Sequence, residues 1–388
     1  MKNFVNKRAA SLQPSGIRKF FDIVQKMEGA VSLGVGEPDF VTPWDVRDAA
    51  IRSLQRGYTQ YTGNRGLPEL RSLISRYLAE RFSVNYPPER TIVTVGASEA
   101  IDLALRAVCD DGDEILIPEP SYVSYAPAVT LAGGTPVAVK CVAGNDFILT
   151  PDLLEKAITS KTKAVIIAYP NNPTGAVMTK EQLEALVPVI EKHDLLVISD
   201  EIYAELTYIG RHVSIASLGN MAERTVLING FSKAFAMTGW RVGFVCAPAE
   251  IDAAMLKIHQ YTILCAPQMS QRAAVAALKN GFDDGFATVE EMREEYGRRG
   301  RFLVNAFNSL GLKCFRPKGA FYVFPSVEST GLDGESFANG LLEKYKVAVV
   351  PGSAFGSAGK NFVRCSYATS MQQLTVAIER ITDFIEGL

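Results

Sequence analysis

The 388-residue sequence holds few of the residues that build metal and redox sites. Its histidines are too far apart in the chain to form a sequence-local zinc site. Its cysteines also lie far apart, and no pair has the spacing of a metal-ligand or redox motif. We therefore expect no bound metal, and we interpret the cysteines as reduced core residues of a cytoplasmic protein. The residues concerned are His193, His212, His259, Cys109, Cys141, Cys246, Cys265, Cys314 and Cys365.

The sequence also lacks an excess of charge of either sign and a long apolar run. Its 40 basic and 42 acidic residues give a net charge of −2 without a basic stripe, which argues against a nucleic-acid partner. The longest uncharged run, residues 120–139, contains three prolines and two adjacent glycines, so it does not predict a membrane span. The basic N-terminus is not followed by the apolar region of a secretory signal. We expect neither nucleic acid nor a membrane as a partner.

What the sequence does contain is a regular alternation of apolar and helical segments. Apolar runs separated by helical stretches predict a mostly parallel sheet that is covered on both faces. The chain is then helical over 249–310, and from residue 311 short strands mix with helices. We therefore predict an α/β fold in which a large domain with a mostly parallel seven-stranded sheet is joined to a smaller α+β domain. The seven strands are expected at 91–95, 114–117, 136–140, 163–168, 195–199, 225–229 and 242–246.

The first 45 residues carry two further expectations. Apolar residues at helical spacing over 17–27 predict an amphipathic arm. Thr42 and Pro43 predict a helix start, with threonine as the cap and proline in the first position. We assign 1–45 to this arm and part of the small domain, 46–285 to the large domain and 286–388 to the small domain.

Lys233 stands in the stretch F-S-K-A-F-A-M-T-G-W-R-V-G, residues 231–243, directly after a predicted buried strand. Lysine is rarely fully buried unless it is paired or used. Desolvation lowers the pKa of a lysine and leaves the nucleophilic amine that Schiff-base chemistry requires. Ser232 and Arg241 add a hydroxyl and a permanent cation, which together suit a phosphate. This stretch alone fits equally well a loop lysine whose ammonium reaches solvent.

Two earlier strands end in segments that could bind a flat, phosphorylated molecule. In open parallel sheets, ligands bind beyond the carboxyl ends of the strands. Strand 91–95 leads into Gly96-Ala97-Ser98-Glu99, where free N–H groups at a helix start suit a phosphate, although many ordinary turns look similar. The strand at 114–117 is followed by Tyr122, whose ring could stack on a flat ligand or belong to the core.

Two later strands end in polar side chains. Asn171 and Asn172 stand between two prolines and predict a rigid loop with hydrogen-bonding side chains. Asp200 follows a buried strand, where a carboxylate is costly unless a cation such as a protonated pyridine nitrogen meets it. A salt bridge or a helix cap would explain a single aspartate as well. Taken together, the five strand ends match the partners of pyridoxal 5′-phosphate (PLP), which are a Schiff-base lysine and an acidic group at the pyridine nitrogen.

Five motifs occur in a fixed order along the chain. With them the sequence resembles the PLP-dependent aminotransferases of fold type I, class I/II, and in particular their bacterial aspartate- and aromatic-type branch. The resemblance covers nearly the whole chain and implies a transaminase that moves the amino group of an L-amino acid to 2-oxoglutarate by a ping-pong mechanism. The motifs are G-E-P-D-F at 36–40, N-P-T-G at 172–175, D-E-I-Y at 200–203, S-K-A-F-A-M-T-G-W-R-V-G at 232–243 and R-C-S-Y-A at 364–368.

The resemblance also implies a role for individual residues. Lys233 would bind the cofactor aldehyde and move the proton between substrate and cofactor, and Asp200 would keep the pyridine nitrogen protonated. The other implied cofactor contacts are Tyr203 and Asn172 at the ring hydroxyl, Tyr122 on the ring face, and the Ala97 N–H, Ser98, Ser232 and Arg241 at the phosphate.

Substrate and dimer contacts follow from the same resemblance. Arg364 would bind the substrate α-carboxylate as a bidentate fork, assisted by Asn172 and the Gly36 backbone. Taken by itself, an arginine on a strand fits a structural ion pair as well. Tyr61 would reach the phosphate in the neighbouring subunit, so the resemblance implies a homodimer with shared active sites.

The sequence departs from the family pattern at Ser98. Aspartate-specific members of this branch tend to carry a lysine at that position to meet the distal carboxylate. A serine there favours aromatic or broad-range donors, with aspartate and N-acetyl-diaminopimelate aminotransferases as alternatives. A PLP-dependent C–S β-lyase fits the same motifs. A catalytically silent binding module is the third alternative, and the presence of Lys233 argues against it.

Overall fold

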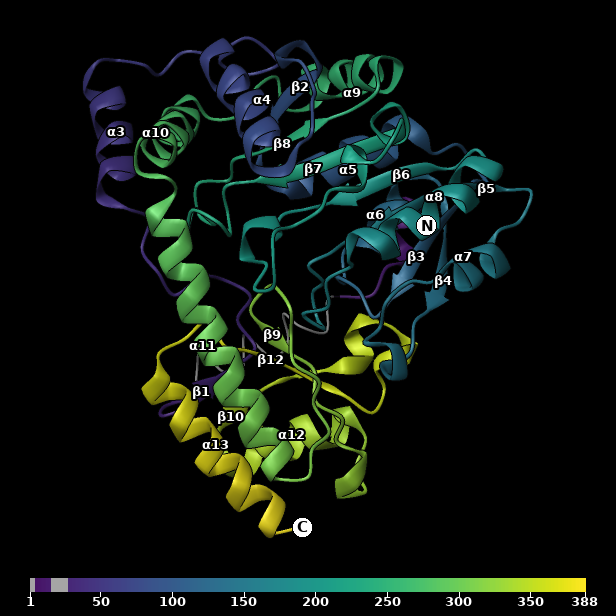
Figure 1. Cartoon of the computed structure of the whole chain (residues 1–388), viewed down its shortest axis with the longest axis vertical. Coiled ribbons are helices and arrows are strands. Elements are labelled where there is room, and N and C mark those ends of the chain that lie inside the picture. Colours follow the sequence, from purple (N-terminus) through teal and green to yellow (C-terminus); the bar gives the residue numbers. More distant parts are fainter. Residues whose placement is uncertain (1–3, 15–26) are drawn as a thin grey trace.

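The computed structural model of the chain describes residues 4–14 and 27–388 (Figure 1). The predicted arm helix at 17–27 therefore lies, apart from its last residue, outside the described residues. Within the described ranges, no helix is long and apolar enough to cross a membrane. A short helix, α1 (Lys7–Ser11), stands near the N-terminus, and the Arg8 guanidinium in it pairs with the Asp111 carboxylate.

The upper half of the molecule in Figure 1 is built on a seven-stranded sheet with the order β2-β8-β7-β6-β5-β3-β4. β8 runs antiparallel to both of its neighbours, and every other pair in the sheet is parallel. The predicted mostly parallel sheet is thus confirmed, and each strand lies within two residues of its expected bounds. The strands are β2 (Thr91–Thr94), β3 (Glu114–Glu119), β4 (Thr135–Lys140), β5 (Thr162–Ile167), β6 (Leu196–Asp200), β7 (Thr225–Gly230) and β8 (Gly243–Cys246).

Helices cover both faces of this sheet because successive strand residues point to opposite sides. Ile198 and Val245 pack in one cluster with α5, α6 and α9, whereas their neighbours Val197 and Phe244 pack in clusters with helices of the other face. We call the elements from α3 to α10 the large lobe. Its helices are α3 (Trp44–Gln55), α4 (Pro68–Phe82), α5 (Gly96–Val108), α6 (Tyr125–Ala132), α7 (Pro151–Ala157), α8 (Lys180–Lys192), α9 (Ala249–Thr262) and α10 (Gln268–Asp284).

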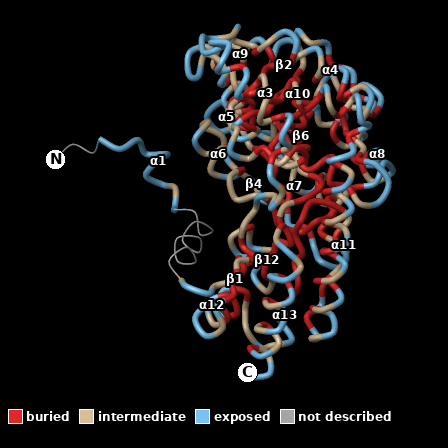
Figure 2. Tube along the Cα trace, turned by 90° about the vertical axis from the view of Figure 1, so that its left-hand side faces the viewer, coloured by how far each residue is buried: buried red, intermediate tan, exposed pale blue. Residues whose placement is uncertain are grey.

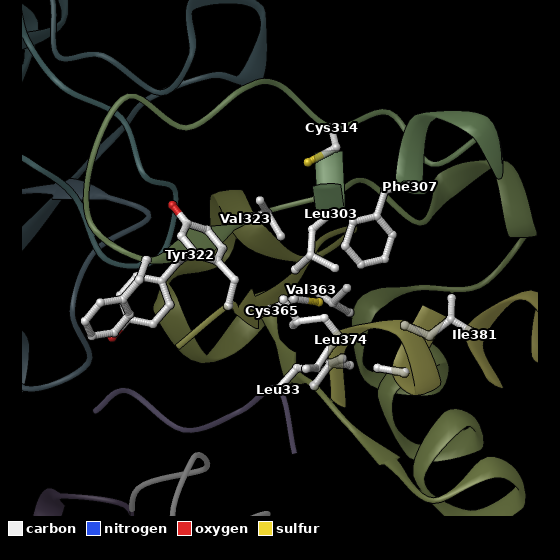
Figure 3. Close-up of a cluster of buried hydrophobic side chains, with 14 of the residues drawn as sticks. Leu33, Leu303, Phe307, Cys314, Tyr322, Val323, Val363, Cys365, Leu374 and Ile381 are labelled. Carbon is white, nitrogen blue, oxygen red and sulfur yellow. The ribbon is translucent and has the colours of Figure 1, made fainter. Parts of the chain in front are cut away.

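The lower half of Figure 1 holds the C-terminal elements, which we call, together with β1, the small lobe. Most of its buried side chains gather in one cluster (Figure 3), which also includes Tyr203 and Leu206 of the large lobe, and both lobes have buried interiors in Figure 2. β11, β12 and β9 form an antiparallel sheet, and β1 pairs with β10. The elements are β1 (Val31–Ser32), α11 (Ala287–Ser309), β9 (Tyr322–Val323), α12 (Gly334–Tyr345), β10 (Val347–Ala348), β11 (Val350–Pro351), β12 (Val363–Ser366) and α13 (Met371–Glu386).

Residues 33–43, which we call the strap, connect β1 in the small lobe to α3 in the large lobe. The predicted cap at Thr42 is wrong, because the helix begins at Trp44 and its N-cap is Pro43. The Thr42 hydroxyl instead donates to the Ala236 carbonyl at 2.6 Å and accepts from the Trp240 indole at 3.0 Å. The strap is thereby tied to the loop that carries Lys233.

Short 3-10 helices lie in the connections between these elements. They span Pro88–Arg90, Ala143–Asn145, Ala204–Leu206, Ile215–Ser217, Met221–Arg224, Glu328–Thr330, Gly352–Phe355 and Ser357–Gly359.

Candidate active site

Lys233 lies in the loop after β7, at the carboxyl end of the large sheet. Its Nζ donates a hydrogen bond of 2.7 Å to the Gly36 carbonyl on the strap. Burial lowers the pKa of Lys233 to about 8, and the positive charges of Arg364 and Arg241 act in the same direction, whereas Glu37 opposes them. The alternative that Lys233 is a loop lysine whose ammonium reaches solvent is therefore wrong. A lysine of this kind holds a larger unprotonated fraction near neutral pH than an ordinary lysine does.

The start of α5 and the loop 231–243 meet to form a small cradle. Gly96 has a φ of +74°, and a Cβ added to it would lie 2.6 Å from Nη2 of Arg241. A Cβ at Gly243, the first residue of β8, would lie 2.7 Å from the Ala97 nitrogen. Only glycines allow so close an approach. The helix start consequently presents its free N–H groups beside a guanidinium, which is the chemistry of an anion site.

The predicted phosphate residues belong to the two segments that form this cradle, Ala97 and Ser98 to the start of α5, and Ser232 and Arg241 to the loop 231–243. Ser232 is buried, Ala97 is half-buried, and Ser98 and Arg241 are exposed. The Nη1 of Arg241 donates to the Thr238 carbonyl at 2.8 Å, which holds the guanidinium over the helix start.

Asp200 is the last residue of β6 and is buried. Among the described residues it forms no ion pair. Its Oδ2 accepts a hydrogen bond of 2.7 Å from the hydroxyl of buried Tyr125, and its Oδ1 accepts from the Ile202 N–H at 3.2 Å. Burial raises the pKa of Asp200, while these two donors lower it. A salt bridge or a helix cap therefore does not explain this carboxylate, and a cationic ligand would.

Arg364 on β12 of the small lobe faces the same region. Its side chain is buried, and no carboxylate of a described residue pairs with it. Its Nη1 donates to Oδ1 of Asn172 at 3.0 Å, and its Nη2 donates to the Gly34 carbonyl at 2.5 Å. Its Nε has no partner among the residues that the structure describes. The structural ion pair that the sequence left open is absent here. A buried guanidinium without a counter-ion is suited to bind an anionic ligand.

Two aromatic rings lie close to the guanidinium of Arg364. Its Cζ lies 4.6 Å from the centroid of the Tyr322 ring and 4.9 Å from that of Phe355. The Tyr322 hydroxyl lies 2.8 Å from the hydroxyl of Tyr203, which follows β6. The ring of Tyr122 packs edge-on against Tyr125, with their centroids 5.6 Å apart. The structure thus brings the predicted residues Tyr203, Asn172 and Arg364 into one region.

Tyr61 is the predicted residue that the fold leaves apart from the others. Its side chain is 81% exposed, in the loop between α3 and α4. This loop is held by contacts such as the hydrogen bond of 2.9 Å from Asn64 Nδ2 to the Leu264 carbonyl. An aromatic side chain displayed in this way is available to a second molecule.

Sequence reasoning missed Tyr125, Tyr322, Phe355 and the role of the Gly34 carbonyl. Tyr125 stands three residues after Tyr122 at a helix start, and this spacing could have suggested a shared face. Tyr322 pairs with Ser366, two residues beyond Arg364, so the two side chains lie on one face of the small sheet. That pairing has no signal in the sequence, because it depends on how β9 and β12 meet.

These residues fit PLP. The cradle at Gly96 and Gly243 would receive the phosphate, since a side chain in either position would fill it. Asp200 offers a buried carboxylate without a cation, and Lys233 an amine of lowered pKa. Arg364, with its unpartnered buried Nε, is left to bind a substrate anion.

Comparison with known proteins points to one family. The family model "Aminotransferase class I and II" matches residues 28–381. The chain is 53% identical to the putative aminotransferase YugH of Bacillus subtilis, with 99% of each chain covered. It is 48% identical to an aspartate aminotransferase of Pyrococcus abyssi, with 97% of each covered. The crystal structure of an aromatic aminotransferase from Pyrococcus horikoshii superposes with a TM-score of 0.91 at 46% identity, covering 96% of this chain and 99% of that one.

Proposed function

The chain belongs to the class I and II aminotransferases, a PLP-dependent family, and we propose that it moves the amino group of aromatic or a broad range of L-amino acids to 2-oxoglutarate. It is thus an aminotransferase, with an amino acid and a 2-oxo acid as substrates. In the proposed ping-pong cycle, the donor leaves as its 2-oxo acid before 2-oxoglutarate binds. The observation that carries the proposal is a lysine of lowered pKa placed between a phosphate cradle and an unpaired buried arginine.

Lys233 and Asp200 carry the proton chemistry in this proposal. PLP, when bound, supplies an electron sink for the electrons left by the substrate Cα–H bond. The Lys233 amine would take the proton from the substrate Cα and pass it on to the cofactor, and its pKa of about 8 lies close to the pH at which it must do both. The Asp200 carboxylate holds a proton on the pyridine nitrogen. Its hydrogen bond from Tyr125 lowers the pKa of this carboxyl and so opposes the effect of burial, which raises it.

The remaining residues bind and orient. Arg364 binds the substrate α-carboxylate, with Asn172 and the Gly36 backbone beside it. The contact of Arg364 with Asn172 and that of Lys233 with the Gly36 carbonyl support this grouping. Tyr203 and Asn172 bind the ring hydroxyl, and Tyr122 stacks on the ring. The Ala97 N–H, Ser98, Ser232 and Arg241 hold the phosphate.

We propose a homodimer with shared active sites, in which Tyr61 reaches the phosphate of the partner subunit. The exposed ring of Tyr61 supports this. We also keep the domain division at 45/46 and 285/286, which the order of the elements along the chain supports. The six cysteines are free, in accord with a cytoplasmic protein.

The charges near Lys233 support an aromatic or broad donor. Among the described residues, the cations that act most on Lys233 are Arg364 and Arg241. The first is assigned to the α-carboxylate and the second to the phosphate. Neither is left for the distal carboxylate of aspartate, and Ser98 supplies no charge. Aspartate or N-acetyl-diaminopimelate as the donor is the alternative.

A donor panel tests the proposal. Phenylalanine, aspartate and N-acetyl-diaminopimelate are each paired with 2-oxoglutarate, pyruvate and oxaloacetate, and kcat/KM is measured for each pair. We expect phenylalanine with 2-oxoglutarate to exceed the other two donors. A clear preference for aspartate would contradict the proposed donor. Release of pyruvate and ammonia from cystathionine, with 2-oxoglutarate unconsumed, would assign the chain to the C–S β-lyases instead.

A further inference from the structure

We propose that Tyr322 is a positioning residue that acts on two parts of the site at once, its hydroxyl on Tyr203 and its ring on Arg364. This rests on the proposed function, which assigns Tyr203 to the ring hydroxyl and Arg364 to the α-carboxylate. Tyr322 is buried on β9. A Cβ added to Gly36 would lie 2.8 Å from its hydroxyl oxygen, so the strap residue that binds Lys233 also passes against Tyr322.

When the cofactor is bound, the hydrogen bond between the Tyr322 and Tyr203 hydroxyls can have only one donor, which is Tyr322. The two hydroxyl oxygens lie 2.8 Å apart, and in the structure either can be the donor. Each phenol has a single proton to donate. If Tyr203 donates its proton to the ring hydroxyl, the contact survives only if Tyr322 donates to Tyr203. Chained hydrogen bonds polarise one another, so this donation strengthens the one that Tyr203 makes.

The ring of Tyr322 has a separate effect on Arg364. The guanidinium Cζ lies 4.6 Å from the centroid of this ring and 4.9 Å from that of Phe355. A desolvated cation gains about 1–2 kcal/mol from such a ring, and two rings fix the plane of the fork. The ring therefore holds Arg364 in the orientation that a bidentate carboxylate needs.

Tyr322 can position residues of both lobes because its own backbone belongs to the small lobe. It stands at one end of the buried cluster that contains Leu303, Val323 and Cys365 (Figure 3). Tyr203, in contrast, follows a strand of the large sheet. The hydroxyl contact thus joins the small lobe to the part of the large lobe that binds the ring.

The hydroxyl is tested with Tyr322→Phe in the holoenzyme. The readout is the pH midpoint of the cofactor absorbance, which reports the protonation of the lysine–cofactor bond independently of turnover. A net hydrogen bond of about 1 kcal/mol corresponds to about 0.7 pH unit. We expect Tyr203→Phe to raise the midpoint, and Tyr322→Phe to raise it by about 0.5 unit. The double variant should match Tyr203→Phe alone, because the hydroxyl of Tyr322 acts through Tyr203.

Tyr367→Phe is the matched control. Tyr367 is buried too, and its hydroxyl donates to the Tyr208 hydroxyl or to the Ala320 carbonyl, each at 3.3 Å, rather than to Tyr203. Its loss should leave the midpoint unchanged. An equal shift in this control would show that any buried tyrosine hydroxyl has the effect, and would overturn the inference.

The ring is tested by comparing Tyr322→Leu with Tyr322→Phe. Both lack the hydroxyl, so their difference isolates the ring. We expect the leucine variant to have a KM for the amino donor about 5–30-fold above that of the phenylalanine variant. Equal KM values would overturn the assignment of the ring.

The outcomes separate this inference from the proposed function. A shift with Tyr203→Phe but none with Tyr322→Phe overturns the inference alone. Additive shifts in the double variant do the same, because they would mean that the hydroxyls act independently. No shift with either variant overturns both the role of Tyr203 and the inference.

Discussion

Arg364 and Asn172 stand 192 residues apart in the chain, yet Nη1 of the arginine donates to Oδ1 of the asparagine at 3.0 Å. The arginine lies on a strand of the small lobe, and the asparagine lies in the loop after β5 of the large sheet. The contact places a buried cation without a counter-ion next to an amide. In the proposed function this pair, drawn from both lobes, binds the substrate carboxylate.

Arg364→Lys should raise the KM for every amino-acid donor by about 100-fold while changing kcat less. A lysine keeps the charge but loses the planar fork and its bidentate geometry. The measurement is a set of KM and kcat values for phenylalanine and aspartate. An effect confined to dicarboxylic donors would assign Arg364 to the distal carboxylate instead.

Lys233→Met should abolish transamination and stabilise the cofactor-free protein at neutral pH. The pKa of Lys233 is about 8 in the folded chain, against about 10.5 when unperturbed, so the unfolded chain binds more protons between these values. Stability of the parent protein therefore rises as the pH goes from 8 to 10.5, and burial of the charge costs most below pH 8. The shift corresponds to at most about 3 kcal/mol.

Denaturant unfolding of the cofactor-free parent and the methionine variant at several pH values checks this. The stability gap should be widest below pH 8 and should close by about pH 10.5. Lys163 serves as a control, because its pKa is raised by its hydrogen bond to Asp113. Lys163→Met should not give a gap that closes over this window. A gap for Lys233→Met that does not depend on pH would contradict the prediction.

Tyr125→Phe should lower kcat/KM by about tenfold and move the acid limb of its pH profile to higher pH. The phenol donates to Asp200 and lowers its pKa, so removing it raises that pKa and favours the protonated acid. Tyr169→Phe is a suitable control, since this buried tyrosine donates instead to the Phe147 carbonyl. An acid limb that stays in place would contradict the role given to Tyr125.

Gly96→Ala should weaken PLP binding by at least tenfold. The residue has a φ of +74°, and the new Cβ would lie 2.6 Å from Arg241 in the phosphate cradle. Gly112→Ala is the matched control, because Gly112 has a φ of +96° with nothing within 4 Å of the added atom. Both variants bear the backbone strain, and only the first should change the dissociation constant of PLP, measured by titration of the cofactor-free protein. Equal losses would attribute the effect to strain.

Much of the fold could be predicted because its strands and helices follow from local patterns of apolar and polar residues. The seven apolar runs form the seven strands of the large sheet, each within two residues of its expected bounds. The strap was less predictable. The pair Thr42-Pro43 looks like a helix start, but a tertiary contact with Ala236 takes the threonine hydroxyl away from the helix.

The sequence by itself determined the strand order along the chain and the motif residues, because periodicity and short motifs depend on neighbours. It led directly to Lys233, Asp200 and Arg364 as candidates. Only the tertiary structure decided what surrounds them. The hydroxyl pair of Tyr203 and Tyr322 spans 119 residues, and no spacing in the sequence encodes it. It exists because the sheet of the small lobe packs against the carboxyl ends of the strands of the large sheet. Polar groups buried there need hydrogen-bond partners.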